Sequence, residues 1–227
     1  MNKLIKYASI TINSLKKRGL KQTLLYLVGE YWFDIRFHVN TRANYLNGDC
    51  TIIGPHLRNA APHYGTNWFL LKGLFGRLIH IGLIDPASAH MIDFGCGAGR
   101  ALMAAQYVGI AKVTGVEFSK RLCLRAEENL RKFAQRNLSK PDLVWEVVHA
   151  DACWYRIPQD ATLFFLYSPF GSPVIDIVAQ HILDFAHSVS HLVTVIYVNP
   201  VHASIFSQLG YVKRQESSEE FSIYVCR

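Results

Sequence analysis

Three glycines follow a short apolar run, residues His90–Phe94, at a spacing that could hold a ligand: Gly95, Gly97 and Gly99. Glycine has no Cβ, so the backbone can turn sharply here and come close to a bound molecule. A helix that begins directly after the glycines would aim its unpaired backbone N–H groups at the same place. The pattern predicts a ligand-binding loop between a strand and a helix. A glycine-rich turn without a ligand is the alternative.

Arg100 separates this loop from the dinucleotide-binding fingerprint G-x-G-x-x-G. The last glycine of that fingerprint lets helix and strand pack closely beside a pyrophosphate. In this sequence Arg100 stands at the corresponding position, three residues after Gly97. We expect a large charged side chain to obstruct such packing. The spacing therefore disfavours NAD, and a nucleotide-cofactor oxidoreductase is the less favoured interpretation.

Asp93, followed by this G-x-G-x-G loop, resembles motif I of the class I S-adenosylmethionine-dependent methyltransferases. The resemblance continues in order along about residues 85–227. Glu117 ends the next strand, where the family has an acid that accepts hydrogen bonds from the ribose hydroxyls. Asp151 and Ala152 resemble the pair that contacts adenine. The resemblance implies S-adenosyl-L-methionine as the cofactor, and it implies these cofactor-binding residues: Tyr64, Asp93, Gly95, Cys96, Gly97, Gly99, Glu117, Phe118, Asp151 and Ala152.

Each acidic residue also has a plain structural interpretation. Glu117 could be an ordinary carboxylate at the end of a strand, and Asp151 could cap the start of a helix. Their joint placement after successive strands favours the functional interpretation, because ligands of open α/β sheets bind beyond the carboxyl ends of the strands. We expect Asp93 to orient the methionyl amine or the nearby backbone from a distance.

The residues after the fourth strand are the candidates for contacting the methyl acceptor: Ser168, Pro169 and Phe170. Methyltransferases that act on planar amino nitrogens carry [Asp/Asn/Ser]-Pro-Pro-[aromatic] here. Ser168 and Pro169 match the first half, whereas Phe170 replaces the second proline. The partial match implies a nitrogen acceptor, on a protein or on another substrate. A strand-to-helix turn, with Pro173 opening the next helix, is the alternative.

Tyr64 lies in a second segment with a family resemblance. Residues Pro62–Thr66 resemble the Tyr-Gly-Glu segment of Dot1-type lysine methyltransferases, with Thr66 in place of the glutamate. In that family the segment lies over the methionine end of the cofactor. The resemblance implies that Tyr64 covers the cofactor, and the alternative is a plain loop tyrosine.

Strand-like and helix-like runs alternate from about residue 88 onward. This alternation predicts an α/β fold with a doubly wound, mainly parallel, seven-stranded Rossmann-like sheet. Two final strands without an intervening helix predict an antiparallel C-terminal hairpin. The expected strands are His90–Phe94, Lys112–Phe118, Leu143–His149, Thr162–Tyr167, Leu192–Val198, Tyr211–Gln215 and Phe221–Cys226, and the expected helices are Ala98–Gly109, Ser119–Leu138, Pro173–Val189 and His202–Leu209.

Residues 1–84 do not share this rhythm and are predicted to form an N-terminal helical extension that caps the methyltransferase domain, residues 85–227. Apolar spacing predicts helices over Leu20–Asp34 and Trp68–Ile81, with a loop over 36–66. Residues 1–60 hold nine Lys and Arg against three Asp and Glu. Such a basic segment could contact nucleic acid or an anionic membrane. A solvated charged face, with residues Tyr31–Phe33 packed on the core, is the alternative.

Composition narrows the class of protein further. Half of the 227 residues are hydrophobic, which excludes a disordered chain. The five cysteines are scattered without a C-x-x-C pair, and the histidines His181, His187 and His191 lack acidic partners, so no disulfide framework and no metal site are expected. Apolar stretches are too short for a transmembrane helix, and we expect a cytoplasmic protein. A methyltransferase-fold protein that binds a partner without turnover is the non-enzymatic alternative.

Overall fold

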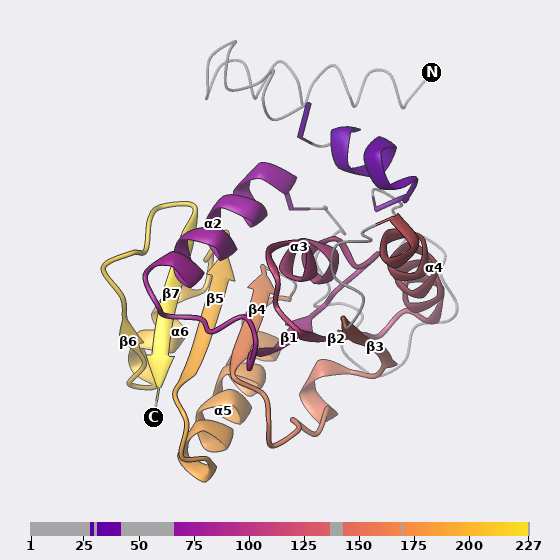
Figure 1. The fold of residues 1–227 in the computed structure, drawn as a ribbon. Coiled ribbons are helices and arrows are strands. Elements are labelled where there is room, and N and C mark those ends of the chain that lie inside the picture. Colours follow the sequence, from indigo (N-terminus) through magenta and orange to yellow (C-terminus); the bar gives the residue numbers. More distant parts are fainter. Residues whose placement is uncertain (1–27, 30, 42–65, 137–142, 169, 227) are drawn as a thin grey trace, which may run out of the picture.

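A seven-stranded sheet lies between two groups of helices in the computed structural model, which describes residues 28–29, 31–41, 66–136, 143–168 and 170–226 (Figure 1). The strand order is β3-β2-β1-β4-β5-β7-β6. Strands β1 to β5 are parallel, whereas β7 runs antiparallel to both β5 and β6. The predicted fold class is confirmed. The strands are β1 His90–Phe94, β2 Lys112–Glu117, β3 Val144–His149, β4 Leu163–Tyr167, β5 Val193–Val198, β6 Val212–Lys213 and β7 Phe221–Cys226.

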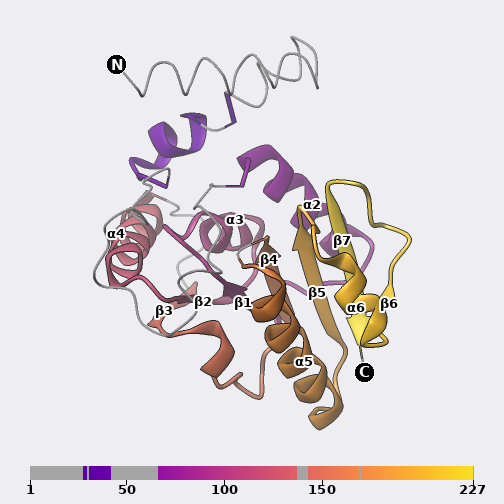
Figure 2. The same ribbon diagram turned by 180° about the vertical axis from the view of Figure 1, so that it is seen from behind.

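The helices divide between the two faces of the sheet, as the two opposite views show (Figures 1 and 2). One face packs against α2 (Trp68–His80), α3 (Arg100–Val108) and α4 (Lys120–Arg136). The other face packs against η2 (Ala152–Trp154), α5 (Ser172–Ser188) and α6 (Ala203–Gln208). Because both faces are covered, strands β4 and β5 are nearly continuous apolar runs, and all five residues of β1 are buried.

The first helical segment ends later than its periodicity predicts. Residues 28–29 and 31–37 are helical, so the predicted end at Asp34 and the predicted loop at residues 36 and 37 are wrong. Aromatic packing explains the extension: Phe33 stacks on Trp68 at 4.3 Å between ring centroids, and Phe37 lies 4.8 Å from Phe133. Both Phe33 and Phe37 are buried in the same core cluster as α2 and α3.

Two finer expectations also need correction. In the segment Tyr31–Phe33 only Phe33 is buried, while Tyr31 is 42% and Trp32 39% exposed. The predicted strand Tyr211–Gln215 shrinks to the two residues of β6. Beyond the two residues of β6, the amide of Arg214 donates one further backbone hydrogen bond, to the carbonyl of Ile223. None of the described helices is long and apolar enough to span a bilayer.

Gly115, in the middle of β2, gives a first testable prediction. A Cβ at this position would lie 2.5 Å from Cys96 Sγ and 2.8 Å from Leu102 Cδ1, in a fully packed core. We expect Gly115→Ala to lower the free energy of unfolding by about 1–3 kcal/mol, as overpacking does. The same change at Gly73 in α2, where a Cβ would meet nothing within 4 Å, is the control and should be neutral or stabilising. Thermal denaturation measures both, and equal melting temperatures would contradict the prediction.

Candidate functional site

The glycine loop connects β1 to α3 at the carboxyl edge of the sheet. Its glycines have φ angles of 79° at Gly95, 54° at Gly97 and 83° at Gly99, all in the left-handed region that favours glycine. The amide of Gly95 donates to the carbonyl of Val116 at 2.8 Å, which ties the loop to the end of β2. A Cβ on Gly99 would approach the Cβ of Ala126 to 3.3 Å. The three glycines are therefore required by the backbone itself.

The sheet reverses its order at this loop. Strand β1 lies between β2 and β4, and the chain leaves β1 toward α3 on one face and leaves β4 toward α5 on the other. Open α/β sheets bind ligands at such a switch point, beyond the carboxyl ends of the strands. The loop thus occupies the position where the fold allows a ligand to approach backbone amides.

Glu117 connects the glycine loop to the segment that follows β2. Its Oε2 accepts a hydrogen bond from the amide of Gly97 at 2.9 Å, and its Oε1 accepts one from the amide of Ser119 at 3.0 Å. The residue is 4% exposed. Both carboxylate oxygens are fixed by backbone donors, so Glu117 is more than an ordinary strand-end acid: it shapes the loop.

Asp93 is a second buried carboxyl group beside Glu117. It is 3% exposed, and its side chain makes no hydrogen bond with the residues that the structure describes. Burial raises the pKa of Asp93 well above its usual value, and the negative charge of Glu117 raises it further. A buried carboxylate without a hydrogen-bond partner is costly unless a cation or a donor reaches it.

Asp151 and its neighbours lie at the ends of β2 and β3. The Oδ1 of Asp151 accepts a hydrogen bond from the amide of Cys153 at 3.0 Å, so the side chain caps η2, which is the structural role that the sequence left open. Ala152 is buried. Phe118 is half-buried, and its carbonyl accepts a hydrogen bond from Nε2 of His149 at 3.0 Å.

The thiol of Cys96 lies under the loop and donates to the carbonyl of Gly97 at 3.8 Å. The same thiol lies against β2, at the place where a Cβ of Gly115 would be, and burial raises the pKa of Cys96 well above its usual value. This side chain is therefore part of the packing under the loop.

Ser168 directly follows β4 and has an unusual backbone conformation. Its φ of 36° is positive, which non-glycine residues adopt rarely and often at functional sites. Burial raises the pKa of Tyr197, whereas hydrogen bonds to its phenol from the backbone of His202 and the side chain of Ser168 lower it. Phe170 is half-buried against the α5 side of the core. Pro169 and Tyr64, together with the basic residues before 28, lie outside the described residues.

His191, one of the three histidines considered for a metal, has another role. Nε2 of His191 bonds the carbonyl of Ala161 at 2.8 Å, and the ring packs near Phe185. Over the described ranges, no group of three or more His, Cys, Asp or Glu is arranged to hold a metal ion.

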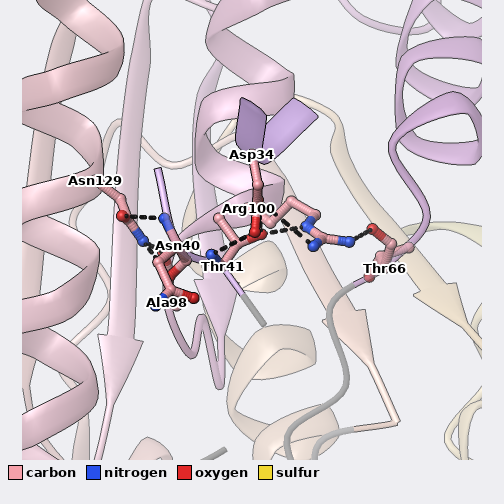
Figure 3. A network of polar contacts seen from close by, with 7 residues as sticks. All are labelled: Asp34, Asn40, Thr41, Thr66, Ala98, Arg100 and Asn129. Atoms are coloured by element: carbon pink, nitrogen blue, oxygen red, sulfur yellow. Dashed lines mark hydrogen bonds and ion pairs between the residues drawn. The ribbon is translucent and has the colours of Figure 1, made fainter. Parts of the chain in front are cut away.

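Sequence reasoning missed a polar network that joins the glycine loop to the N-terminal segment (Figure 3). Arg100, expected to obstruct packing beside a pyrophosphate, is buried and turns toward Thr41 and Thr66. Asn129 of α4 joins Ala98 to Asn40. The only sequence signal for these contacts was the presence of polar residues in otherwise apolar positions, such as Asn129 on the buried stripe of α4.

Comparison with known proteins gives no sequence match and a clear structural one. No family model matches the chain, and no curated protein matches it. The magnesium protoporphyrin IX methyltransferase from Synechocystis PCC 6803, solved with bound SAM, is 13% identical and has a TM-score of 0.52 over 91% of this chain and 97% of that one. An RNA methyltransferase from Salinibacter ruber in complex with S-adenosyl-L-homocysteine is 21% identical, with a TM-score of 0.46 over 68% and 90%. The likeness to the Synechocystis enzyme shows that the chain has the fold of the class I S-adenosylmethionine-dependent methyltransferases, with a mainly parallel seven-stranded sheet and an antiparallel β7.

Proposed function

We propose that this protein is an S-adenosylmethionine-dependent methyltransferase. The observation that carries the proposal is the pair of buried carboxyl groups at the glycine loop, with Asp93 lacking a hydrogen-bond partner among the described residues. Two acids in one buried place favour a ligand that carries positive charge. The methionine amine and the sulfonium of S-adenosylmethionine are both cationic. A dinucleotide would instead bring a pyrophosphate, whose negative charges these acids repel, which argues against the oxidoreductase alternative.

The residues present fit this cofactor. The loop of Gly95, Gly97 and Gly99 offers close backbone approach. Asp93 would provide a negative charge for the amine of the cofactor, because a bound cation lowers the raised pKa of this acid. Glu117 is the acid for the ribose hydroxyls, by sharing or exchanging its bond to the Gly97 amide. Asp151, after β3, stands where the family resemblance implies the adenine contact. When bound, the cofactor supplies an activated methyl group, so the chain has mainly to position an acceptor and exclude water.

We propose further that the acceptor is a nitrogen bound near Ser168 and Phe170. The support is the match of Ser168 to the amino-methyltransferase motif, together with its positive φ at the end of β4, directly beside β1. A strained residue persists where the surrounding structure holds it, and such residues cluster at active sites. Ser168 would bind and orient the acceptor N–H group. The alternative is a methyltransferase-fold protein that binds a partner and has no turnover. Such a protein would keep the cofactor residues but would need no strained residue at position 168, so the strain favours the enzyme.

Calorimetry with S-adenosylmethionine, with NAD as the rival ligand, tests the proposal. We expect one molecule of S-adenosylmethionine or S-adenosylhomocysteine to bind per chain, and NAD neither to bind nor to compete. Transfer of a labelled methyl group to amine- and amide-containing acceptors then tests turnover, with Ser168→Ala lowering the rate on the true acceptor and leaving cofactor binding intact. Binding of NAD in place of S-adenosylmethionine would contradict the proposal.

A further inference from the structure

Arg100 connects the glycine loop to two distant parts of the N-terminal segment. It is the first residue of α3, and its side chain is only 3% exposed. Nε donates to Thr41 Oγ1 at 2.6 Å, and Nη1 donates to the carbonyl of Thr66 at 3.1 Å. Nη2 lies 3.7 Å from Asp34 Oδ1. One guanidinium thus holds chain on both sides of residues 42–65 (Figure 3).

Asn129 makes a second connection from α4. Its Nδ2 donates to the carbonyl of Ala98, inside the glycine loop, at 2.9 Å and to the carbonyl of Asn40 at 3.0 Å. Its Oδ1 accepts from the amide of Asn40 at 2.9 Å. The side chain of Asn129 is fully buried. The side-chain amide of Asn129 is therefore hydrogen-bonded to the glycine loop and to the N-terminal segment at the same time.

These contacts are interdependent. Thr41 accepts from Arg100 while its hydroxyl donates to Asp34 Oδ1 at 2.6 Å and its amide donates to Asp34 Oδ2 at 3.1 Å. Asp34 and Thr41 are both buried, and their contacts with Arg100 persist only while residues 34–41 lie against α3. Buried polar networks are favourable when fully satisfied and costly when partly satisfied. Partial release of residues 34–41 would therefore be costly, which favours release of the segment as a unit.

We propose that Arg100 and Asn129 are positioning residues that couple docking of residues 34–41 to the cofactor-binding shape of the glycine loop. The inference rests on the proposed function, since the ligand of that loop is taken as S-adenosylmethionine. By thermodynamic reciprocity, docking strengthens cofactor binding by the same factor by which the cofactor strengthens docking. Couplings of this kind are typically about 5- to 150-fold.

Hydrogen exchange and calorimetry test whether docking and ligand binding strengthen each other by the same factor. Both are measured on the full chain, with S-adenosylhomocysteine as the probe. In the wild type, we expect the ligand to slow exchange of the amides of residues 34–41 by about tenfold or more. Arg100→Met should weaken binding of S-adenosylhomocysteine by a similar factor, because it releases the segment. Thr41→Val keeps Arg100 and the shape of residue 41 but removes the hydroxyl, and it should weaken binding in the same direction, by about fivefold.

The controls separate coupling from general damage. Arg214→Met removes an exposed arginine paired with Glu216 in the C-terminal hairpin and should change neither measurement. Unchanged protection of residues 34–41 on ligand binding, with normal affinity in Arg100→Met, would overturn the inference while leaving the proposed function in place. Weaker binding in Arg100→Met with normal binding in Thr41→Val would also overturn it, because Arg100 would then act on the loop directly. A wild type that binds no S-adenosylhomocysteine would contradict the proposed function itself.

Discussion

Glu117→Gln is expected to weaken binding of S-adenosylmethionine by about 10- to 150-fold, or roughly 1.5–3 kcal/mol. The glutamate accepts hydrogen bonds from the amides of Gly97 and Ser119, one at each carboxylate oxygen. A glutamine has one oxygen and one NH₂ group, so its NH₂ must face one of these two backbone donors. The substitution therefore disturbs the loop and also removes the charge that would bind ribose hydroxyls.

Calorimetry at a temperature well below the melting transition measures this effect without interference from unfolding. Glu220→Gln, an exposed glutamate next to β7, is the matched control and should bind the cofactor as the wild type does. We also expect a lower melting temperature for Glu117→Gln alone. Unchanged affinity in Glu117→Gln would contradict the prediction and would remove the carboxylate from the cofactor site.

Asp93→Asn is expected to change stability and binding in opposite directions. At about pH 8 and without cofactor, the variant should be more stable than the wild type by roughly 0.5–2 kcal/mol, since it removes a buried acid that lies beside Glu117. Binding of S-adenosylmethionine should weaken by about tenfold or more, because the neutral amide no longer attracts the cationic amine. Thermal denaturation and calorimetry on the same preparation measure the two effects.

The pH dependence of Asp93→Asn follows from the raised pKa of Asp93. Because this pKa is raised in the folded chain, Asp93 holds its proton to higher pH there than in the unfolded chain, which releases it above about pH 4. The stability of the wild type therefore falls as pH rises from about 4 toward the raised pKa of folded Asp93. The advantage of the variant should shrink as pH is lowered toward 4. Asp160→Asn is a control of opposite sign: hydrogen bonds from Lys112 and His90 lower the pKa of Asp160 to about 2, so its loss should destabilise the protein near neutral pH and leave cofactor binding unchanged. A variant Asp93→Asn that is less stable than the wild type at pH 8 would contradict the argument.

The sheet could be predicted from sequence because its signals are local. A buried parallel strand needs apolar residues on both faces, and runs such as Leu163–Tyr167 and Val193–Val198 show this directly. The glycine loop, Glu117 at the end of β2 and Asp151 after β3 could be found for the same reason, because each lies within a few residues of a recognisable strand end. Ser168 could be placed at the end of β4, but its positive φ depends on the surrounding structure and has no signature in the residue type.

The contacts of Arg100 could not be predicted, since nothing periodic links it to its partners. Its hydrogen bond to Thr41 spans 59 residues, and the bond to Thr66 spans 34. From the sequence, Arg100 could therefore be interpreted only as a residue that disfavours NAD. The late end of the helical residues 31–37 was missed for a related reason, because Phe37 is held by Phe133, far away in the chain.

The docking of residues 34–41 on α4 also sets an order of events during synthesis. Asn40 bonds a residue 89 positions later in the chain. At a translation rate of about 5–20 residues per second, roughly 4–18 s pass between the synthesis of the two partners. Over that interval Phe33 and Phe37, buried in the finished protein, lack Phe133, the ring of α4 against which both of them pack. The N-terminal segment is thus made early but assembled late, and nascent chains that end before Asn129 are expected to be the ones that chaperones hold.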